Sequence, residues 1–450
     1  MISEDTAVMK ERRYIMKVNE TKGLVVVFVH TNYSLISGGT EKFVRQYNDL
    51  LQNEGYNTLS FFPIESSPPF IKEKLAGVIY NGRFEYITYY KEIPRLIDCY
   101  LTKNNDQRIS VCIQHLKNHD FNIISNVIQY YKAPTSLFVH DYYMLCVNSR
   151  LINSKGLQCG FTLPNSEKCD SCVYGLKAME HSKNIRTFIE CIKPYLYKVF
   201  TPSEFVKEVI VNSFSSLQGM LYVRPHLCFC GKKEIEVIKD DKIKLAYIGA
   251  QIRDKGYYEW KKIVEYIKLS CPDDYELYYF GYGTDKTEGV TNIYVAESSG
   301  QKMEIILQEY DISCALFWSL CGETYSYTYY EMLASGVFVL TNKVSGNVAY
   351  EVGKNHSGII FDSIEDCKEW LSDTVRCKNE INMYRKKTTF PACFIPNSDI
   401  DISFIVWTGS HSTRCTSKKI KKNYYATALY RLKHFLNQNG KNSCAGEKVE

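Results

Sequence analysis

Residues 321–340 read CGETYSYTYYEMLASGVFVL and contain two glutamates, Glu323 and Glu331, with seven residues between them. The second glutamate opens an apolar turn that Gly336 ends before the apolar run 337–340. This order predicts a loop, a short helix, a glycine cap and a buried strand. Because the two carboxylates are separated by one or two helical turns, they can face one cleft and accept hydrogen bonds from the hydroxyls of a sugar or ribose.

The alternation of strand and helix patterns begins twice along the chain. The apolar run 24–29 is followed by a loop and an amphipathic helical pattern over 40–53, and the run 243–249 precedes a second such helix at 257–267. Continuous apolar runs of this length are typical of strands buried on both faces of a parallel sheet. We therefore expect an α/β protein with two Rossmann-like units facing across a cleft, with a linker at 220–241.

Further strand patterns support this division, and the tail is less regular. We predict the strands at 56–62, 110–114, 136–139, 197–200, 275–280 and 312–316. The tail lacks clear periodicity over 378–417, and 390–403 is interpreted as a loop. The expected organisation is a flexible arm (1–21), an N-terminal unit (22–220) with a cysteine-rich insertion (141–180), a C-terminal unit (242–377) and an extension (378–450) with a helix at 421–437.

Composition narrows the class of protein. The 450 residues are 45% hydrophobic and 23% charged, values typical of a globular chain, and the length exceeds that of one ordinary core. The formal charge of +5 is small for this length, so nucleic acid is not an expected partner. No run approaches the ~18 apolar residues of a membrane span, and no cleavage site follows residues 24–29. These features indicate a cytoplasmic protein whose 17 cysteines are mostly reduced.

Two loops carry residues suited to a phosphate ligand. Gly38 and Gly39 lie between the first predicted strand and its helix, where backbone amides and the helix N-terminus favour an anion. Arg253 and Lys255 follow the first strand of the second unit, where fixed cations neutralise a diphosphate. The alternative interpretations are an ordinary tight turn and a solvated basic loop.

Weaker signals follow other predicted strands. Gly281 and Gly283 end one strand, and Ser345, Gly346 and Asn347 follow another, where turn chemistry is the alternative interpretation. His115 and His140 each end a strand of the first unit, although a single histidine is more often structural than catalytic.

In their order along residues 22–365, these motifs resemble the retaining glycosyltransferases of family 4, which have the GT-B fold. The resemblance implies transfer of a sugar from a nucleotide diphosphate sugar to a glycan or lipid-linked acceptor. It implies that the leaving phosphate acts as the base and that catalysis needs no cofactor. The family's usual arginine position holds Ala250 or Gln251, so Arg253 is expected to substitute.

The resemblance also assigns roles to individual residues. Lys255 and Arg253 would hold the diphosphate and Glu331 the ribose, while the glycine loops and residues 345–347 would border the donor. Glu323 would contact the donor sugar and His115 would position it.

Four cysteines form a separate pattern: Cys146, Cys159 and the pair Cys169 and Cys172. A C-x2-C pair with two further thiols suffices for a structural zinc site, with an iron–sulfur cluster or four free thiols as alternatives. The segment also resembles a subset of bacterial transferases of surface polysaccharide biosynthesis (O-antigen or capsule). Such a zinc would stiffen the insertion and would take no part in catalysis.

Two other functions remain open from the sequence. One is a GT-B nucleotide-sugar enzyme that is not a transferase, such as a 2-epimerase, and the other is a non-catalytic homologue that binds nucleotide sugars. The basic run 418–422 is either a solvated segment or a site of peripheral contact with the anionic inner face of a membrane.

Overall fold

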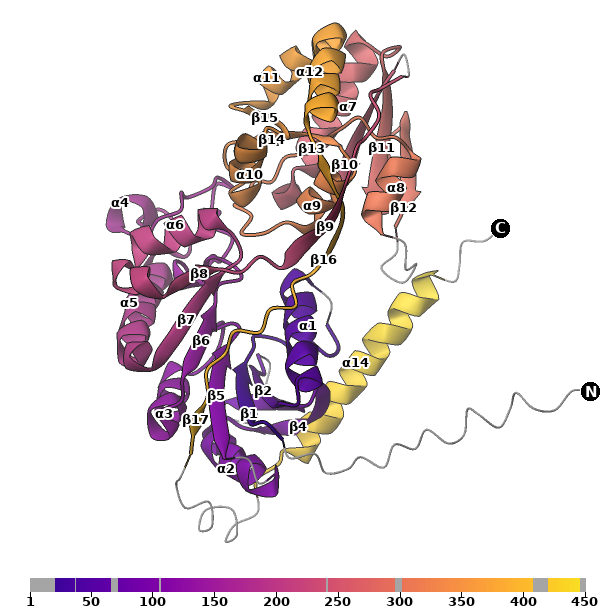
Figure 1. Cartoon of the computed structure of the whole chain (residues 1–450). Coiled ribbons are helices and arrows are strands. Elements are labelled where there is room, and N and C mark those ends of the chain that lie inside the picture. The colour runs from indigo at the N-terminus through magenta and orange to yellow at the C-terminus, as the bar shows by residue number, and fades with distance from the viewer. Residues whose placement is uncertain are drawn as a thin grey trace, which may run out of the picture.

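The computed structural model describes residues 21–36, 38–65, 72–104, 107–239, 242–295, 302–407 and 420–445, with the backbone alone from 435 onward. Two α/β units stand one above the other in Figure 1, each built on its own sheet. Most of the predicted arm (1–20) and part of the basic run (418 and 419) lie outside the described residues.

The first unit contains a mostly parallel sheet in the order β4-β3-β2-β1-β5-β6-β7-β8. Its strands are β1 (Leu24–Phe28), β2 (Asn57–Pro63), β3 (Leu75–Tyr80), β4 (Arg83–Tyr89), β5 (Arg108–Ile113), β6 (Thr135–Phe138), β7 (Leu196–Thr201) and β8 (Leu221–Val223). Its helices are α1 (Gly39–Asn53), α2 (Ile93–Asn104), α3 (Phe121–Tyr131), α4 (Ser166–Cys169), α5 (Gly175–Ile192) and α6 (Glu204–Ser213).

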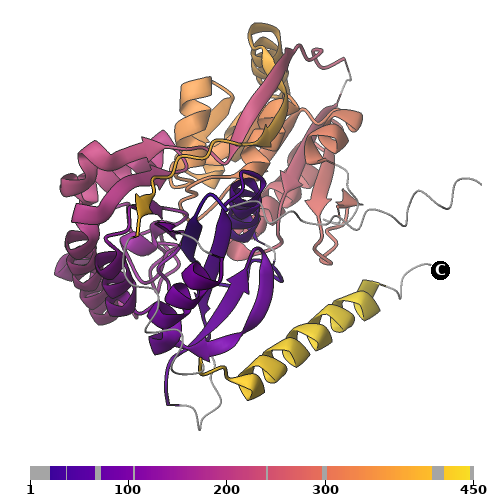
Figure 2. The same ribbon diagram turned by 60° about the horizontal axis from the view of Figure 1, so that its bottom comes forward.

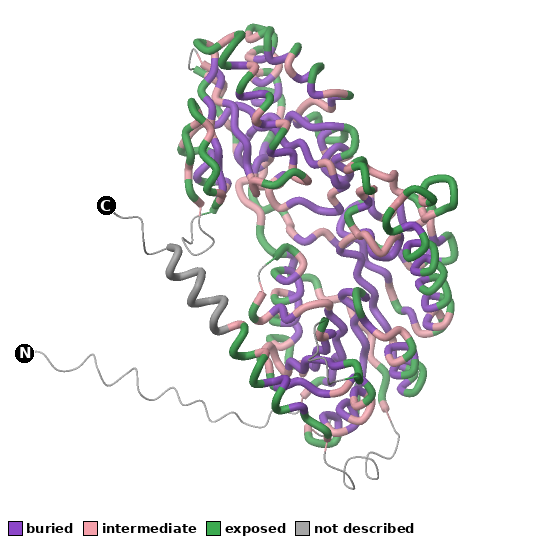
Figure 3. Tube along the Cα trace, turned by 180° about the vertical axis from the view of Figure 1, so that it is seen from behind, coloured by how far each residue is buried: buried purple, intermediate pink, exposed green. Residues whose placement is uncertain are grey.

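Strand β1 shows why its sequence is apolar at every position. Val25 and Val27 enter one hydrophobic cluster, whereas Leu24, Val26 and Phe28 enter another on the opposite face. All five residues are buried, because successive side chains of a strand point to opposite faces and helices cover both. Figure 3 shows the buried trace running through both sheets.

The second unit is a six-stranded parallel sheet in the order β12-β11-β10-β13-β14-β15. Its strands are β10 (Ile243–Ile248), β11 (Tyr275–Gly281), β12 (Val290–Tyr294), β13 (Cys314–Phe317), β14 (Phe338–Asn342) and β15 (Gly358–Phe361). Its helices are α7 (Tyr257–Ser270), α8 (Met303–Glu309), α9 (Tyr327–Ala334), α10 (Asn347–Asn355), α11 (Ile364–Ser372) and α12 (Thr374–Lys387). Its order is that of a Rossmann sheet, so the expected fold class of two Rossmann-like units is confirmed.

The connection between the units differs from the prediction. β9 (Leu227–Lys233) and β16 (Phe390–Pro396) pair as an antiparallel ribbon where the chain passes between the units. Residues 220–241 and 390–403, interpreted as linker and loop, therefore contain strands. Each strand pairs with a partner far away in the sequence and contributes little to either core, so neither shows a local hydrophobic period. The helix α12 also continues through residue 377, the predicted end of the second unit.

The tail returns to the first unit. After β16 it runs along that unit to β17 (Ile405–Val406), which pairs with β5, and ends in α14 (Tyr424–Ala445) (Figures 1 and 2). The first turns of α14 are hydrogen-bonded to β4: Ile87 N donates to Thr427 Oγ1 at 2.9 Å, and Asn423 N donates to Ile87 O at 2.8 Å. The C-terminal helix thus packs back on the first unit, and it starts at Tyr424 rather than at the predicted residue 421.

Arg385 on α12 connects the second unit to the segment between β9 and β10 through hydrogen bonds, and this arrangement predicts an effect on stability. Its side chain is 1% exposed and donates to Gly336 O, Glu236 O and Ile312 O and to the carboxylate of Asp311. We expect Arg385→Met to lower the free energy of unfolding by about 3 kcal/mol in urea titrations, because buried acceptors lose their donor.

The matched control is Arg376→Met on the same helix. Arg376 is 58% exposed and pairs with Glu380. Since surface ion pairs contribute about 0–1 kcal/mol, equal losses in the two variants would contradict a special role for Arg385.

Candidate active site

Each sheet brings two polar residues together where the strand order reverses. In the first unit His30 follows β1 and His115 follows β5, and their rings lie 4.3 Å apart between centroids. In the second unit Lys255 follows β10 and Glu323 follows β13, with Lys255 Nζ 2.6 Å from Glu323 Oε1. The crevice beyond the carboxyl ends of strands at such a point is the usual ligand site of open α/β sheets.

His115 is held in one tautomer. Its Nδ1 accepts a hydrogen bond from Lys117 N at 3.0 Å, so Nε2 carries the proton and donates it toward Asp141 Oδ2 at 3.2 Å. Burial by itself would raise the pKa of Asp141, but interaction with His115 and hydrogen bonds outweigh burial and leave the pKa below its ordinary value. Burial, followed by the neighbouring His115, lowers the pKa of His30 to about 3. Near neutral pH, Asp141 beside His115 is therefore ionised, and His30 is neutral.

The Lys255–Glu323 pair lies at the entrance of the second unit. Ser319 Oγ donates to the same oxygen, Glu323 Oε1, at 2.9 Å, and the glutamate side chain is 12% exposed whereas that of Lys255 is 41% exposed. Attraction to Glu323 raises the pKa of Lys255, so the lysine stays protonated. A partly exposed ammonium beside a carboxylate that is only slightly exposed can contact a phosphate and a sugar hydroxyl together.

The loop that carries Glu323 is hydrogen-bonded to residues 345–347, which were predicted to border the donor phosphates. Glu323 N donates to Ser345 O at 3.1 Å and Asn347 N donates to Glu323 O at 2.8 Å. Gly346 has φ +65°, and a methyl group there would lie 2.7 Å from Glu323 O. The Ser345 hydroxyl is hydrogen-bonded within this loop region, to Asn342 Oδ1 among others. These residues thus support the Glu323 loop, and their contact with phosphate stays a prediction.

The same loop contacts the first unit. Thr324 Oγ1 donates to His140 O at 2.6 Å, and Tyr142 OH donates to Glu323 O at 3.4 Å. His140 itself is 7% exposed, and its Nε2 lies 2.8 Å from Gln114 Oε1. It is therefore the main-chain carbonyl of His140, and not its imidazole, that contacts the second unit.

Glu331 lies apart from Lys255, on α9. Burial, followed by the neighbouring Glu304, raises its pKa from 4.5 to about 7, and Lys42 opposes the shift. Lys42 reaches from α1 of the first unit, with Nζ 4.7 Å from the centre of the Tyr327 ring, and Tyr327 also lies beside Gly39. The sequence analysis did not select Lys42, although it follows the glycine pair in the first turn of α1.

Gly281 and Gly283, the other two predicted glycines, lie at the end of β11 where neighbouring groups leave no room for a side chain. A side chain at Gly283 would collide with Gln251, and one at Gly281 would collide with the Tyr279 hydroxyl and Gly249 O. Gln251 Nε2 donates to Asp285 O at 2.6 Å and Gln251 Oε1 accepts from Asp285 N at 2.8 Å. The Gln251 side chain, at one of the two positions where the resemblance led us to expect an arginine, therefore closes this loop.

Arg253 faces the cysteine-rich insertion. A methyl group on Gly156 would lie 2.6 Å from Arg253 Nη2, and the adjacent Asp254 is paired with Arg150 of the insertion. The insertion thus lines the contact between the units, and a donor-binding role for Arg253 stays a prediction.

The four predicted zinc ligands share one neighbourhood. Burial, and then Cys172, Cys146 and Cys169, raise the pKa of Cys159 to about 11. Within the described parts of the chain, however, the side chains of His, Cys, Asp and Glu form no group of three or more arranged to hold a metal ion. The thiols as placed do not make a metal centre, and structural zinc stays a prediction.

The partly buried Glu331 predicts a pH dependence of stability. Since its pKa is raised to about 7, the folded chain keeps a proton that the unfolded chain has lost above about 4.5. We expect the free energy of unfolding of the wild type to fall relative to Glu331→Gln between pH 5 and 8, by at most about 3 kcal/mol.

Urea titrations across this pH range measure that difference. Glu365→Gln, at a glutamate that is 72% exposed, should follow the wild type at every pH. A constant difference between the wild type and Glu331→Gln would contradict the raised pKa.

This chain is similar to known proteins in structure but not in sequence. No protein-family model and no curated protein sequence matches this chain. Among solved structures it is similar to sucrose-phosphate synthase from Thermosynechococcus elongatus (12% identity, 93% of this chain and 100% of that one, TM-score 0.47). It is also similar to Anabaena HepE in complex with UDP-glucose (9%, 81% and 93%, TM-score 0.46). A third is the lipopolysaccharide outer core galactosyltransferase WaaB (11%, 81% and 95%, TM-score 0.49).

Identities of 9–12% do not transfer a substrate or an activity to this chain. Among the residues that the structure describes, no helix combines the length and the apolar character needed to cross a bilayer.

Proposed function

We propose that this chain is a retaining glycosyltransferase similar to family 4, which moves a sugar from a nucleotide diphosphate sugar to a glycan or lipid-linked acceptor. The observation that carries the proposal is the pair of strand-order reversals, one presenting Lys255 and Glu323 and the other His115 and Asp141. The loop of Thr324 joins them across the two units. Such a site has separate places for a charged donor and a hydroxyl acceptor.

The roles follow from charge and position. Lys255 would hold the diphosphate, Glu331 the ribose and Glu323 the donor sugar, with His115 on the opposite wall. In the transfer the bond from the anomeric carbon to the diphosphate oxygen breaks and a bond to the acceptor oxygen forms on the same face. The proton of the acceptor hydroxyl passes to the leaving phosphate. We place this reaction in surface polysaccharide biosynthesis, in the cytoplasm or at the inner face of the membrane.

Nucleotide release from a panel of nucleotide sugars tests the proposal. The wild type is compared with Glu331→Ala and with the exposed-site control Glu365→Ala, using crude lipid extract and oligosaccharides as acceptors. Release with one donor that requires an acceptor and is lost in Glu331→Ala alone would support a transferase. Acceptor-independent turnover of the nucleotide sugar would instead indicate an epimerase.

A second candidate, a non-catalytic nucleotide-sugar-binding protein, is favoured by one observation. Arg253 packs against Gly156 and the Gln251 side chain is hydrogen-bonded to Asp285, so the contacts of both side chains are with the protein and neither is shown to serve a diphosphate. Donor binding measured by calorimetry without nucleotide release from any donor would support this candidate and refute the transferase.

A further inference from the structure

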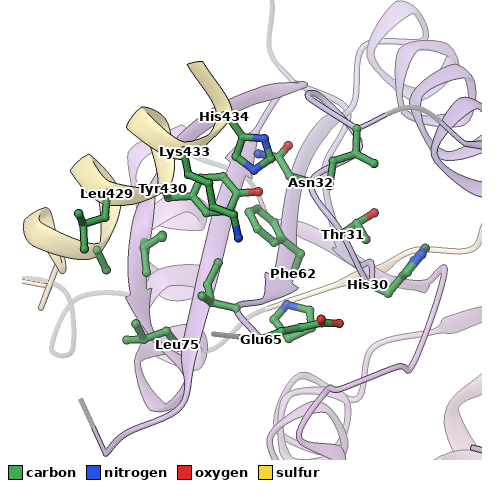
Figure 4. A pocket seen from close by; sticks show the side chains of 15 residues that line it. His30, Thr31, Asn32, Phe62, Glu65, Leu75, Leu429, Tyr430, Lys433 and His434 are labelled. Atoms are coloured by element: carbon green, nitrogen blue, oxygen red, sulfur yellow. The ribbon is translucent and has the colours of Figure 1, made fainter. Parts of the chain in front are cut away.

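A cavity in the described part of the first unit lies beneath α14. It measures about 570 Å³, a size typical of small-molecule sites. Its walls come from the loop after β1, from the end of β2, from β3 and β4, and from one face of α14 (Figure 4). The roof is not a loosely placed helix, because the first turns of α14 are hydrogen-bonded to β4 through Asn423 and Thr427.

One end of the cavity adjoins the proposed active site. His30 lines the cavity and also packs against His115, with ring centroids 4.3 Å apart and the ring planes tilted by 36°. His30 Nε2 lies 3.3 Å from Glu41 Oε1, whose carboxylate also accepts from Thr31 Oγ1 at 2.6 Å. A ligand that fills the cavity would therefore place one end beside His115.

The lining changes character along its length. In Figure 4, Leu75 and Leu429 lie at the end away from His30 and Thr31, and Phe62 lies between. Further aliphatic walls come from Ile64 and Ile87. An oligosaccharide in this distal part would leave many hydroxyls without partners, which is costly, whereas a hydrocarbon chain loses nothing there.

Hydrogen-bond donors gather nearer the active site. Lys433 extends from α14 into the cavity beside Phe62 (Figure 4). Asn32 is fully buried, and its Nδ2 has no partner within hydrogen-bond distance. Its Oδ1 accepts from Ser34 N and Ser34 Oγ, so only its amide hydrogens, which lie toward the Tyr430 hydroxyl of α14, are left to pair with a ligand oxygen. A cation and an unpaired buried amide together suit an anionic head group.

We propose that this cavity, roofed by α14, binds an amphipathic acceptor that carries an aliphatic chain and a phosphate. The chain packs against Leu75, Ile87 and Leu429, and the phosphate lies near Lys433 and Asn32. This inference rests on the proposed function only in calling the ligand an acceptor. Binding itself does not depend on any transfer step.

Calorimetric titration of the full-length protein with n-decyl phosphate, below its micellar concentration and without donor, tests the proposal. We expect binding of one molecule per chain, with inorganic phosphate and a linear oligosaccharide at least about 10-fold weaker, since each buried methylene adds to affinity. Leu429→Trp should weaken decyl phosphate at least about 10-fold by occupying the distal end, the equivalent of two or more methylenes.

The matched control is Leu432→Trp. Leu429 and Leu432 are both exposed on α14, at 41% and 54%, but only Leu429 lines the cavity. Equal affinities in the two variants, or decyl phosphate binding no tighter than inorganic phosphate or the oligosaccharide, would overturn the proposal.

Nucleoside diphosphate binding by the same protein is measured separately. Decyl phosphate binding without nucleoside diphosphate binding would refute the proposed function and leave the cavity assignment standing. The reverse result would refute the cavity assignment alone.

Discussion

Lys255→Ala is expected to reduce nucleotide release about 10²–10³-fold with the donor that the wild type uses. The ammonium of Lys255 stands at the strand-order reversal of the second sheet, 2.6 Å from Glu323. Negative charge builds on the leaving diphosphate as the sugar bond breaks, and a positioned cation stabilises that charge more than the ground state. The loss should therefore appear mainly in kcat rather than in KM.

The fold should tolerate this change. The Lys255 side chain is 41% exposed, and a partly exposed ion pair contributes little to stability. Lys262→Ala on α7 provides the control, since Lys262 is 55% exposed and pairs with Glu259 at the surface. Equal turnover in both variants would remove Lys255 from the proposed site.

Gly346→Ala is expected to cause the second-largest loss of turnover, because the added methyl group would collide with the backbone of Glu323. Gly346 adopts φ +65°, and an added methyl group would lie 2.7 Å from Glu323 O and 2.8 Å from Glu323 N. Two backbone hydrogen bonds hold that contact, so relief requires the Glu323 loop to move. A displacement of about 1 Å at a catalytic group costs on the order of 100-fold in turnover. Strain should also lower the free energy of unfolding by about 1–3 kcal/mol.

Gly353→Ala in α10 is the control for Gly346→Ala. A methyl group at Gly353 would lie 3.5 Å from Ile360 Cδ1, an ordinary contact. Alanine is the better helix former there, by about 0.5–1 kcal/mol, so this variant should keep its turnover and gain stability. Kinetic assays and urea titrations on both variants decide the matter, and wild-type turnover in Gly346→Ala would contradict the supporting role of this loop.

Several elements were predictable because their signals are local. Strands β1 and β10 are apolar at nearly every position because helices cover both faces of each sheet, and such runs can be recognised without knowing the partners. The β3–β4 hairpin was missed although its signal is present. Asn81 and Gly82, both with positive φ, form its turn between two apolar runs.

The candidate site was predictable only in part. The sequence motifs select Lys255 and Glu323, and the structure brings the two side chains together. They do not select Lys42, whose charge lowers the pKa of Glu331 from the other unit, or His30, which packs against His115. Nor do they show that Arg253 packs against Gly156. Each of these contacts joins loops that are distant in the sequence.

The sequence by itself determined the two α/β units and the loops that follow their strands, because periodicity and turn chemistry act over a few residues. Only the tertiary structure decided that β9 pairs with β16 and that α14 returns to roof a cavity beside His30. It also decided that Glu331 is partly buried, with a pKa raised by desolvation and by Glu304, whereas Glu323 is paired with a lysine. Burial and charge at a site depend on which distant segments pack around it, and no local pattern contains that information.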